Sequence, residues 1–187
     1  MAEIEEIQEI RRKLKKKLDP GRYEHTLGVA FTAAALAMCH GEDILKAELA
    51  GTLHDCAKYG TEAEQLMRYR KSGQEPGREI LLRPAVLHAK AGRILAEKKY
   101  GVTDGDVLNA VEFHTTGRAG MSRLEKIVFI ADYIEPGRTK AEDLPRIRRL
   151  AFTDLDACML EILADTVDYL LKKRSHIHPD TLLAKGY

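Results

Sequence analysis

Helix signals recur along the whole chain, and no run of alternating residues typical of a β-strand interrupts them. Two capping boxes, Thr61 with Glu64 and Ser122 with Glu125, mark helix starts, and Thr103 with Asp106 resembles one more weakly. Breaks follow at Gly41, Gly60, Gly73, Gly101, Gly117 and Pro136-Gly137. This pattern predicts an all-α protein, a globular helix bundle.

The spacing of apolar residues predicts where these helices lie. We expect them at about 3–18, 22–40, 44–58, 62–71, 85–100, 104–115, 123–134, 143–151 and 154–173, with an irregular loop over 71–84. The length of 187 residues fits one domain over 1–187. Its core is expected at about 20–140, with C-terminal helices within 143–187 packed on it.

Composition excludes several classes of function. Thirty basic and 29 acidic residues give a net charge of +1, so no overall field favours nucleic acid or a membrane surface. The longest apolar stretch is far below the roughly 20 residues that span a bilayer, which predicts a cytoplasmic protein. Cys39, Cys56 and Cys158 are too scattered for a disulfide framework, and we interpret them as small core residues.

Asp132 is the most informative polar residue, because it lies in a helix that is apolar on nearly every side, over 127–134. A buried carboxylate without a partner would cost several kcal/mol. One interpretation is structural, with Asp132 paired with an arginine or capping a nearby helix. The alternative is that it binds a metal, and the histidines elsewhere in the chain favour this alternative.

His54 and Asp55 are adjacent on the helix predicted over 44–58 and diverge by roughly 100° around its axis. Imidazole and carboxylate are ligands that a divalent metal accepts at neutral pH. Lys58 follows His54 at four residues and Asp55 at three, which places its ammonium on the same face. It is expected either to contact a phosphate of the substrate or to be an ordinary surface lysine near a helix end.

Three more histidines, His25, His88 and His114, occur where an apolar residue would be the easier choice. Each is weak evidence alone, because most helical histidines are solvated or hydrogen-bonded. His40, at a helix end beside Gly41, fits that ordinary interpretation better. His176 and His178 follow the last predicted helix and either cover a ligand or face solvent.

The order His25, His54-Asp55, Asp132 resembles the signature of the HD-domain metal-dependent phosphohydrolases. The segments around these residues (22–29, 53–58, 113–117, 131–138 and 177–179) resemble more closely the YqeK family, the bacterial symmetrical bis(5'-nucleosyl)-tetraphosphatases. Two features depart from that family: Ala89 directly follows His88 where we expect glycine, and the chain ends in Lys185-Gly186-Tyr187. These departures concern nucleotide contacts and not the metal ligands.

The resemblance implies metal-dependent cleavage of diadenosine tetraphosphate in the middle of its phosphate chain, yielding two ADP through a metal-bound hydroxide. It implies His25, His54, Asp55 and Asp132 as metal ligands, with His88 and His114 either binding a second metal or donating to phosphate. Iron is the expected metal, with manganese, cobalt and zinc as alternatives. Asp55 and Lys58 would be catalytic, and substrate contacts would come from Arg22, Lys58, His88, His114, Thr115, Arg138, Ser175, His176, Ile177 and His178.

Other functions remain open from the sequence. The metal cage fixes the chemistry but not the substrate, so a nucleoside monophosphatase or an alarmone hydrolase is the nearest alternative enzyme. A nucleotide-sensing module without turnover is an alternative of another class. The expected partner is a small nucleotide, with no nucleic acid and no membrane, and a homodimer is a further expectation.

Overall fold

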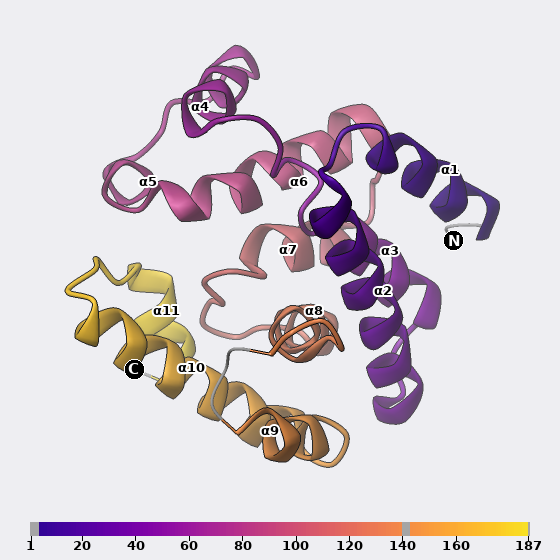
Figure 1. The fold of residues 1–187 in the computed structure, drawn as a ribbon, viewed down its shortest axis with the longest axis vertical. Helices are drawn as coiled ribbons and strands as arrows, with labels where there is room; N and C mark the ends of the chain where they lie inside the picture. The colour runs from indigo at the N-terminus through magenta and orange to yellow at the C-terminus, as the bar shows by residue number, and fades with distance from the viewer. Residues whose placement is uncertain (1–3, 140–142, 187) are drawn as a thin grey trace.

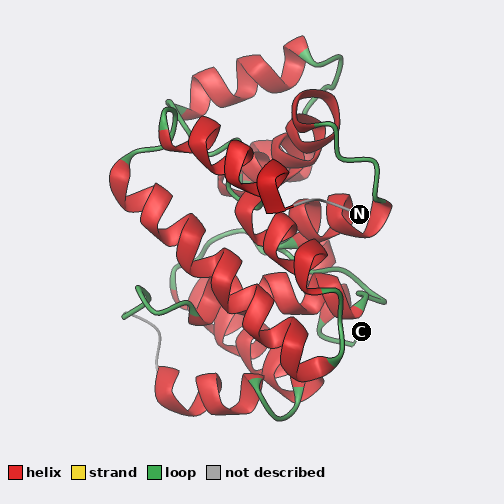
Figure 2. Cartoon of the chain, turned by 90° about the vertical axis from the view of Figure 1, so that its right-hand side faces the viewer, coloured by secondary structure: helices red, strands yellow, loops and turns green. Residues whose placement is uncertain are grey.

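The computed structural model describes residues 4–139 and 143–186, and its regular elements there are all helices (Figure 2). No strand occurs within these ranges, so the all-α prediction is confirmed. A 3₁₀ turn at Pro84–Val86 leads into α6. The helices are α1 (Ile4–Lys15), α2 (Pro20–His40), α3 (Ile44–Leu53), α4 (Glu62–Lys71), α5 (Arg78–Leu82), α6 (Leu87–Tyr100), α7 (Gly105–Phe113), α8 (Arg123–Ile134), α9 (Leu144–Ala151), α10 (Leu155–Lys172) and α11 (Pro179–Ala184).

Helix α8 is the centre of the fold. It is seen almost end-on near the middle of Figure 1, and α2, α3, α7, α9 and α10 all pack against it. Ile127, Val128 and Ile130 are fully buried there, as the apolar sequence of this helix requires. The predicted Ser122–Glu125 capping box begins the helix, and the Thr61–Glu64 box begins α4. None of the described helices is long and apolar enough to cross a membrane.

Among the described helices, α2 packs most extensively against α3, and this packing places two of the predicted metal ligands side by side. Gly51 permits this approach, because a Cβ at that position would lie 2.8 Å from Ala30 Cα. His25 projects from α2, and His54 is the residue that follows the end of α3. Small residues at the contact thus bring the two imidazoles together.

Three local predictions were wrong. Helix α3 ends at Leu53, not near residue 58, and His54 to Ala57 form turns. The cap of α7 is Asp104, whose side chain accepts from the amides of Asp106 and Val107, and not Thr103. Cys39 is exposed on α2, where its thiol contacts Phe152 O, because it faces away from the core.

Two short helices were also missed. Helix α5 lies inside the predicted loop over 71–84, where Ile80 joins a small separate core with Val86 and Leu87. Helix α11 follows the last predicted helix and begins at Pro179 with His178 as its cap. Five or six residues are too few for an apolar period to be visible in the sequence.

Candidate metal centre

Asp55 lies at the centre of a cluster of four histidine side chains. Its Oδ1 is 3.1 Å from His88 Nε2 and 3.8 Å from His114 Nε2, and its Oδ2 is 3.4 Å from His54 Nε2 and 3.8 Å from His25 Nε2. Each histidine comes from a different element: α2, the turn after α3, α6 and the residue after α7. The packing of these helices on one another therefore brings the predicted ligands together.

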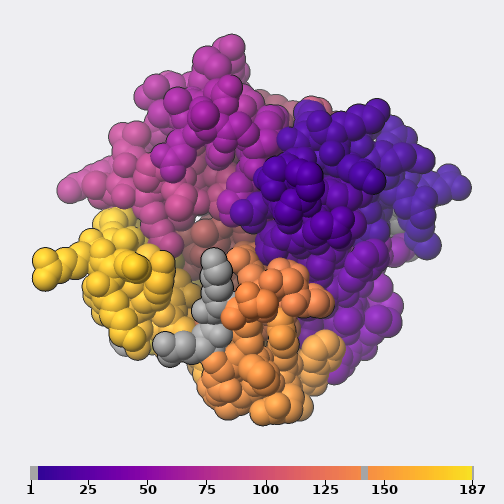
Figure 3. Space-filling model, viewed as in Figure 1, coloured from indigo at the N-terminus to yellow at the C-terminus, as the bar shows by residue number. Residues whose placement is uncertain are grey.

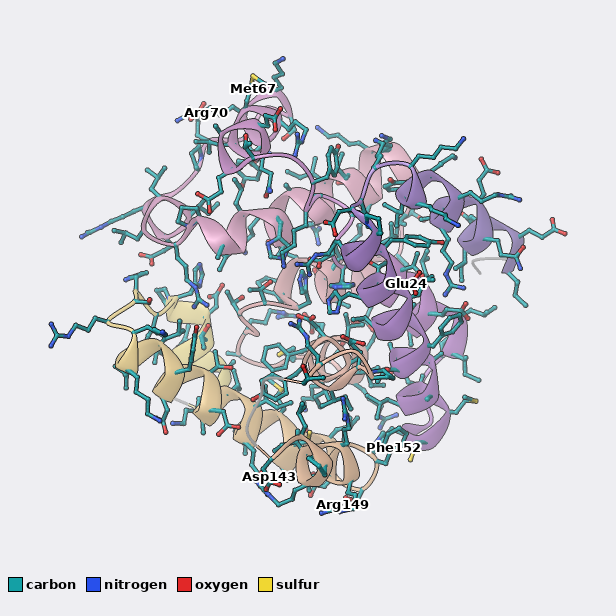
Figure 4. The ribbon with its side chains drawn as sticks, in the orientation of Figure 1. Glu24, Met67, Arg70, Asp143, Arg149 and Phe152 are labelled. Atoms are coloured by element: carbon teal, nitrogen blue, oxygen red, sulfur yellow. The ribbon has the colours of Figure 1, made fainter. Side chains whose placement is uncertain are left out.

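The cluster contains two groups suited to a metal ion, His25–His54–Asp55 and Asp55–His88–His114. Within each group the ligand atoms all lie within 4.8 Å of one another, and Asp55 belongs to both. The cluster is interior, between α2, α7 and α8. In Figure 4, by contrast, the labelled side chains of Met67 and Phe152 lie near the edge of the molecule, and both are exposed.

Asp132 adjoins this cluster but belongs to neither group of three. Its Oδ1 lies 3.0 Å from His25 Nε2, and Arg138 binds the same oxygen at 2.6 Å and the Asp132 carbonyl at 2.9 Å. The sequence predicted a buried carboxylate, but 23% of the Asp132 side chain is exposed, because this turn of α8 faces a cleft. Asp132 therefore has an arginine partner, as the structural interpretation expected, and also a neighbouring histidine, as the metal interpretation expected.

The hydrogen bonds of the imidazoles fit a cation at this position. His54 Nδ1 donates to Gly51 O at 2.7 Å and His114 Nδ1 donates to Val111 O at 2.8 Å, so the neutral rings leave Nε2 unprotonated. His54 Nε2 lies only 3.3 Å from His25 Nε2, and His114 Nε2 lies 3.1 Å from His88 Nε2. Two unprotonated nitrogens this close repel one another, so each pair needs either a shared proton or a metal cation between its members.

The donor set supports the same conclusion. Asp55 Oδ1 is buried and makes no hydrogen bond of acceptable geometry with the described residues, although nitrogen atoms of His88, Lys58 and His114 lie 3.1, 3.4 and 3.8 Å from it. A buried carboxylate oxygen without a hydrogen bond is costly, and a metal ion would satisfy it. Imidazole nitrogen together with carboxylate oxygen suits a first-row divalent metal.

A cleft of about 770 Å³ opens beside the cluster. Its walls include His114, Asp132 and Arg138 on the metal side and Tyr169 and Lys172 of α10 on the other side. Figure 3 shows the same face hollowed where the C-terminal segment, in yellow, approaches the pink segment of α5 and α6. A ligand in this cleft would therefore reach the cluster from solvent.

Comparison with known proteins decides the family. The model of the HD domain matches residues 22–137. The chain belongs to the HD domain family. This stretch contains every histidine and aspartate of the cluster, whereas α1 lies before it and α9 to α11 lie after it.

Relatives and a solved structure agree with this membership. The HD-domain chain is 43% identical over 171 residues to a protein of Halalkalibacterium halodurans named symmetrical bis(5'-nucleosyl)-tetraphosphatase, covering 90% of this chain and 89% of that one. It is 38% identical to the Bacillus subtilis protein of the same name, with 93% and 92% covered. A crystal structure from Clostridium acetobutylicum, described as a predicted HD superfamily hydrolase involved in NAD metabolism, superposes with a TM-score of 0.91 at 43% identity, covering 96% and 95%.

The electrostatics of the HD-domain cluster favour an ionised Asp55 carboxylate and act differently on individual imidazoles. Burial alone would raise the pKa of Asp55, but His54 and His88 outweigh it and hold that pKa well below its usual value. Burial lowers the pKa of His88, and burial with the charges of His54 and His88 lowers the pKa of His114 to about 3. For His54 the Asp55 carboxylate outweighs burial and raises the pKa.

Other residues predicted from the sequence also lie at the cluster. Arg22 Nη1 binds Asp55 Oδ2 at 2.8 Å, and Lys58 Nζ lies 3.4 Å from Asp55 Oδ1, although Lys58 is beyond the helix on which it was expected. Thr115 Oγ1 lies 3.1 Å from His114 Nε2 and 3.5 Å from His88 Nε2. Arginine, lysine and hydroxyl groups thus surround the histidines, where an anion could replace their present partners.

The C-terminal residues lie apart from the cluster. His178 Nδ1 accepts from the amide of Asp180 at 3.2 Å and caps α11, while His176 contacts the Glu79 carboxylate of α5. Ser175 is exposed and Ile177 half-buried in the segment before α11. His40 Nε2 bonds to Ala151 O at 2.7 Å, outside the cluster as expected. The structure therefore gives each of these histidines a partner outside the cluster.

The sequence did not point to Glu135, which is buried against the cluster. Its Oε1 lies 3.1 Å from His25 Nδ1, and its Oε2 accepts from the amide of Gly137 at 2.6 Å. The available signal was a glutamate directly between an apolar helix and a Pro-Gly break. Tyr133 and Tyr169, which line the cleft, carried no chemical signal in the sequence.

Proposed function

We propose that this chain hydrolyses diadenosine tetraphosphate symmetrically to two ADP with a divalent metal held by His25, His54, Asp55 and Asp132. The observation that carries the proposal is the convergence of four histidines on Asp55 beside an open cleft. The substrate is inferred from relatives at 38–43% identity that carry the name of this activity over most of the chain. His88 and His114 would hold a second ion together with Asp55.

When bound, a divalent metal supplies Lewis-acid activation of water and neutralises phosphate charge. The groups of the chain itself bind and orient the substrate. Arg22 and Lys58 now pair with Asp55, and Arg138 pairs with Asp132. Asp55 and Asp132 would hold the metal, and the three cations that now pair with them would bind phosphate oxygens.

The leaving group fits this assignment of roles. The second pKa of the terminal phosphate of a nucleoside diphosphate is about 6, so this leaving group departs as an anion without a proton donor. Positive charge beside the leaving oxygen therefore contributes more than acid catalysis. We assign this role to Lys58 and Arg138, and Thr115 would donate its hydroxyl to a phosphate oxygen.

The outer part of the cleft suits the nucleoside ends of such a substrate. Tyr133 and Tyr169 line it, and aromatic rings offer surfaces on which a base can stack. Arg83 and Lys172 line it too and place positive charge away from the metal cluster. Iron as the metal stays a prediction of the family resemblance, and a cytoplasmic location and a homodimer stay predictions from the sequence.

The test is product analysis with protein purified without oxygen. Chromatography of the products from diadenosine tetraphosphate should show ADP alone, and Asp132→Ala should be inactive. His40→Ala removes a histidine outside the cluster and should keep the wild-type rate. Equal amounts of AMP and ATP would overturn symmetrical cleavage. Phosphate release from nucleoside monophosphates without attack on the dinucleotide would favour a monophosphatase instead.

A further inference from the structure

Glu135 is a buried carboxylate directly behind His25, on the side away from the proposed metal. It follows the last residue of α8, and only 5% of its side chain is exposed. Both carboxylate oxygens are engaged, one by His25 Nδ1 at 3.1 Å and the other by the amide of Gly137 at 2.6 Å. Among the described residues, His25 is the ionisable side chain with which it pairs.

The backbone around Glu135 is fixed from outside the cluster. Arg148 of α9 donates to three carbonyl oxygens of this turn: Ile134 at 2.9 Å, Glu135 at 2.9 Å and Arg138 at 3.0 Å. One guanidinium thus ties the end of α8 to α9. The position of the carboxylate is therefore set by the fold rather than by a flexible side chain alone.

Helix α2 makes room for this carboxylate at Gly28, one turn beyond His25. An ideal Cβ on Gly28 would lie 2.6 Å from Glu135 Oε2 and 3.3 Å from its Cδ. Both of these distances are too short for ordinary contact. A residue larger than glycine at position 28 would displace the carboxylate from its place behind His25.

The partner of Nδ1 distinguishes His25 from two other histidines of the cluster. His54 and His114 donate Nδ1 to the carbonyl of the residue three positions earlier, so their own helices orient them. His25 has instead a carboxylate from the residue that follows α8, 110 positions away in the chain. A ring whose Nδ1 donates to a carboxylate presents an unprotonated Nε2, which here faces Asp132 and Asp55.

We propose that Glu135 is a positioning residue that holds His25 with its proton on Nδ1 and its Nε2 directed at the metal, and that Gly28 provides the space for it. The inference rests on the proposed metal cage. It assigns no contact with substrate to Glu135. A positioning carboxylate of this kind typically changes metal affinity by about 10-fold to 100-fold.

The test compares Glu135→Ala, Gly28→Ala and wild type by two measurements. Nitrogen-15 NMR of the metal-free protein reports which ring nitrogen of His25 carries the proton. Competition against a fluorescent chelator reports the affinity for Mn²⁺. We expect both variants to lose the Nδ1-protonated form of His25 and to bind Mn²⁺ about 10-fold more weakly or worse.

Two features of the design separate the outcomes. Gly28→Ala favours the helix and meets only the end of a side chain, so it should keep the fold. Glu125→Gln is a matched control: Glu125 is also buried, at the other end of α8, where it binds Arg118. This variant should lose stability without changing the protonation of His25.

Unchanged His25 protonation and unchanged Mn²⁺ affinity in Glu135→Ala would overturn the inference. A wild-type protein that binds no Mn²⁺ would instead overturn the proposed function, while the NMR result still tests Glu135.

Discussion

Gly51→Ala should loosen the contact between α2 and α3 and thereby weaken the metal centre. The new Cβ would lie 2.8 Å from Ala30 Cα, 3.1 Å from Ala30 N and 3.2 Å from Val29 O. All three are backbone atoms, which cannot rotate away. To reach ordinary van der Waals contact the two helices must separate by about 0.6 Å at this point.

The magnitude follows from two opposing contributions. Overpacking against a rigid backbone costs about 3 kcal/mol, the upper end of the usual range. Replacing glycine by alanine in a helix stabilises the native state by about 1 kcal/mol. The net loss is therefore about 2 kcal/mol, which for a chain of 187 residues lowers the unfolding temperature by about 4–8 °C.

The same separation should reach the metal ligands. Gly51 O accepts the Nδ1 hydrogen bond of His54, so a displaced α3 carries this ring away from His25 on α2. We expect affinity for Mn²⁺ to fall by about tenfold in the protein that remains folded at 25 °C.

Thermal unfolding in a chelating buffer and a Mn²⁺ titration measure the two effects separately. Gly105→Ala is the control, because Gly105 begins α7 with no atom within 4 Å of its Cβ position. Its stability should stay within about 0.5 kcal/mol of wild type. A Gly51→Ala protein with wild-type unfolding temperature and wild-type metal affinity would refute the reasoning.

Three further predictions concern other parts of the chain. Asp104→Ala removes the cap of α7 and should cost about 1 kcal/mol in urea unfolding at neutral pH. The hydrogen bond from Lys46 lowers the pKa of Asp104 below its ordinary value of 3.8. Wild type should therefore have a larger free energy of unfolding than Asp104→Asn above pH 3.8, and this difference should disappear as the pH falls further. Arg138→Met should lower kcat about tenfold or more with little change in bound metal, because the guanidinium of Arg138 lines the cleft. A variant with the wild-type kcat would exclude a role of Arg138 in stabilising the leaving group.

Helix positions and the residue types of the cluster could be predicted because each depends on local sequence. Capping boxes, glycine breaks and an apolar helix carrying Asp132 are visible within a few residues. The same local reasoning extended α3 too far, since nothing in the sequence signals that His54 to Ala57 turn away from the helix.

Partners from distant helices could not be predicted. The pairing of Arg22 with Asp55 and of Glu135 with His25 joins residues 33 and 110 positions apart. Such pairs depend on how the helices pack, which a single sequence does not specify. The sequence shows glycine at positions 28 and 51 but not the reason for it. The structure gives the reason, because a Cβ at Gly28 would meet Glu135 and a Cβ at Gly51 would meet Ala30.

The central claim is that Asp55 and the surrounding histidines hold a divalent metal, and metal content per chain tests it most directly. Elemental mass spectrometry of protein purified without oxygen should find about one or two transition-metal ions per chain. Asp55→Ala, which removes the carboxylate shared by both groups of ligands, should contain almost none while remaining helical by circular dichroism. A metal-free wild-type protein, or an Asp55→Ala protein that retains its metal, would contradict the account.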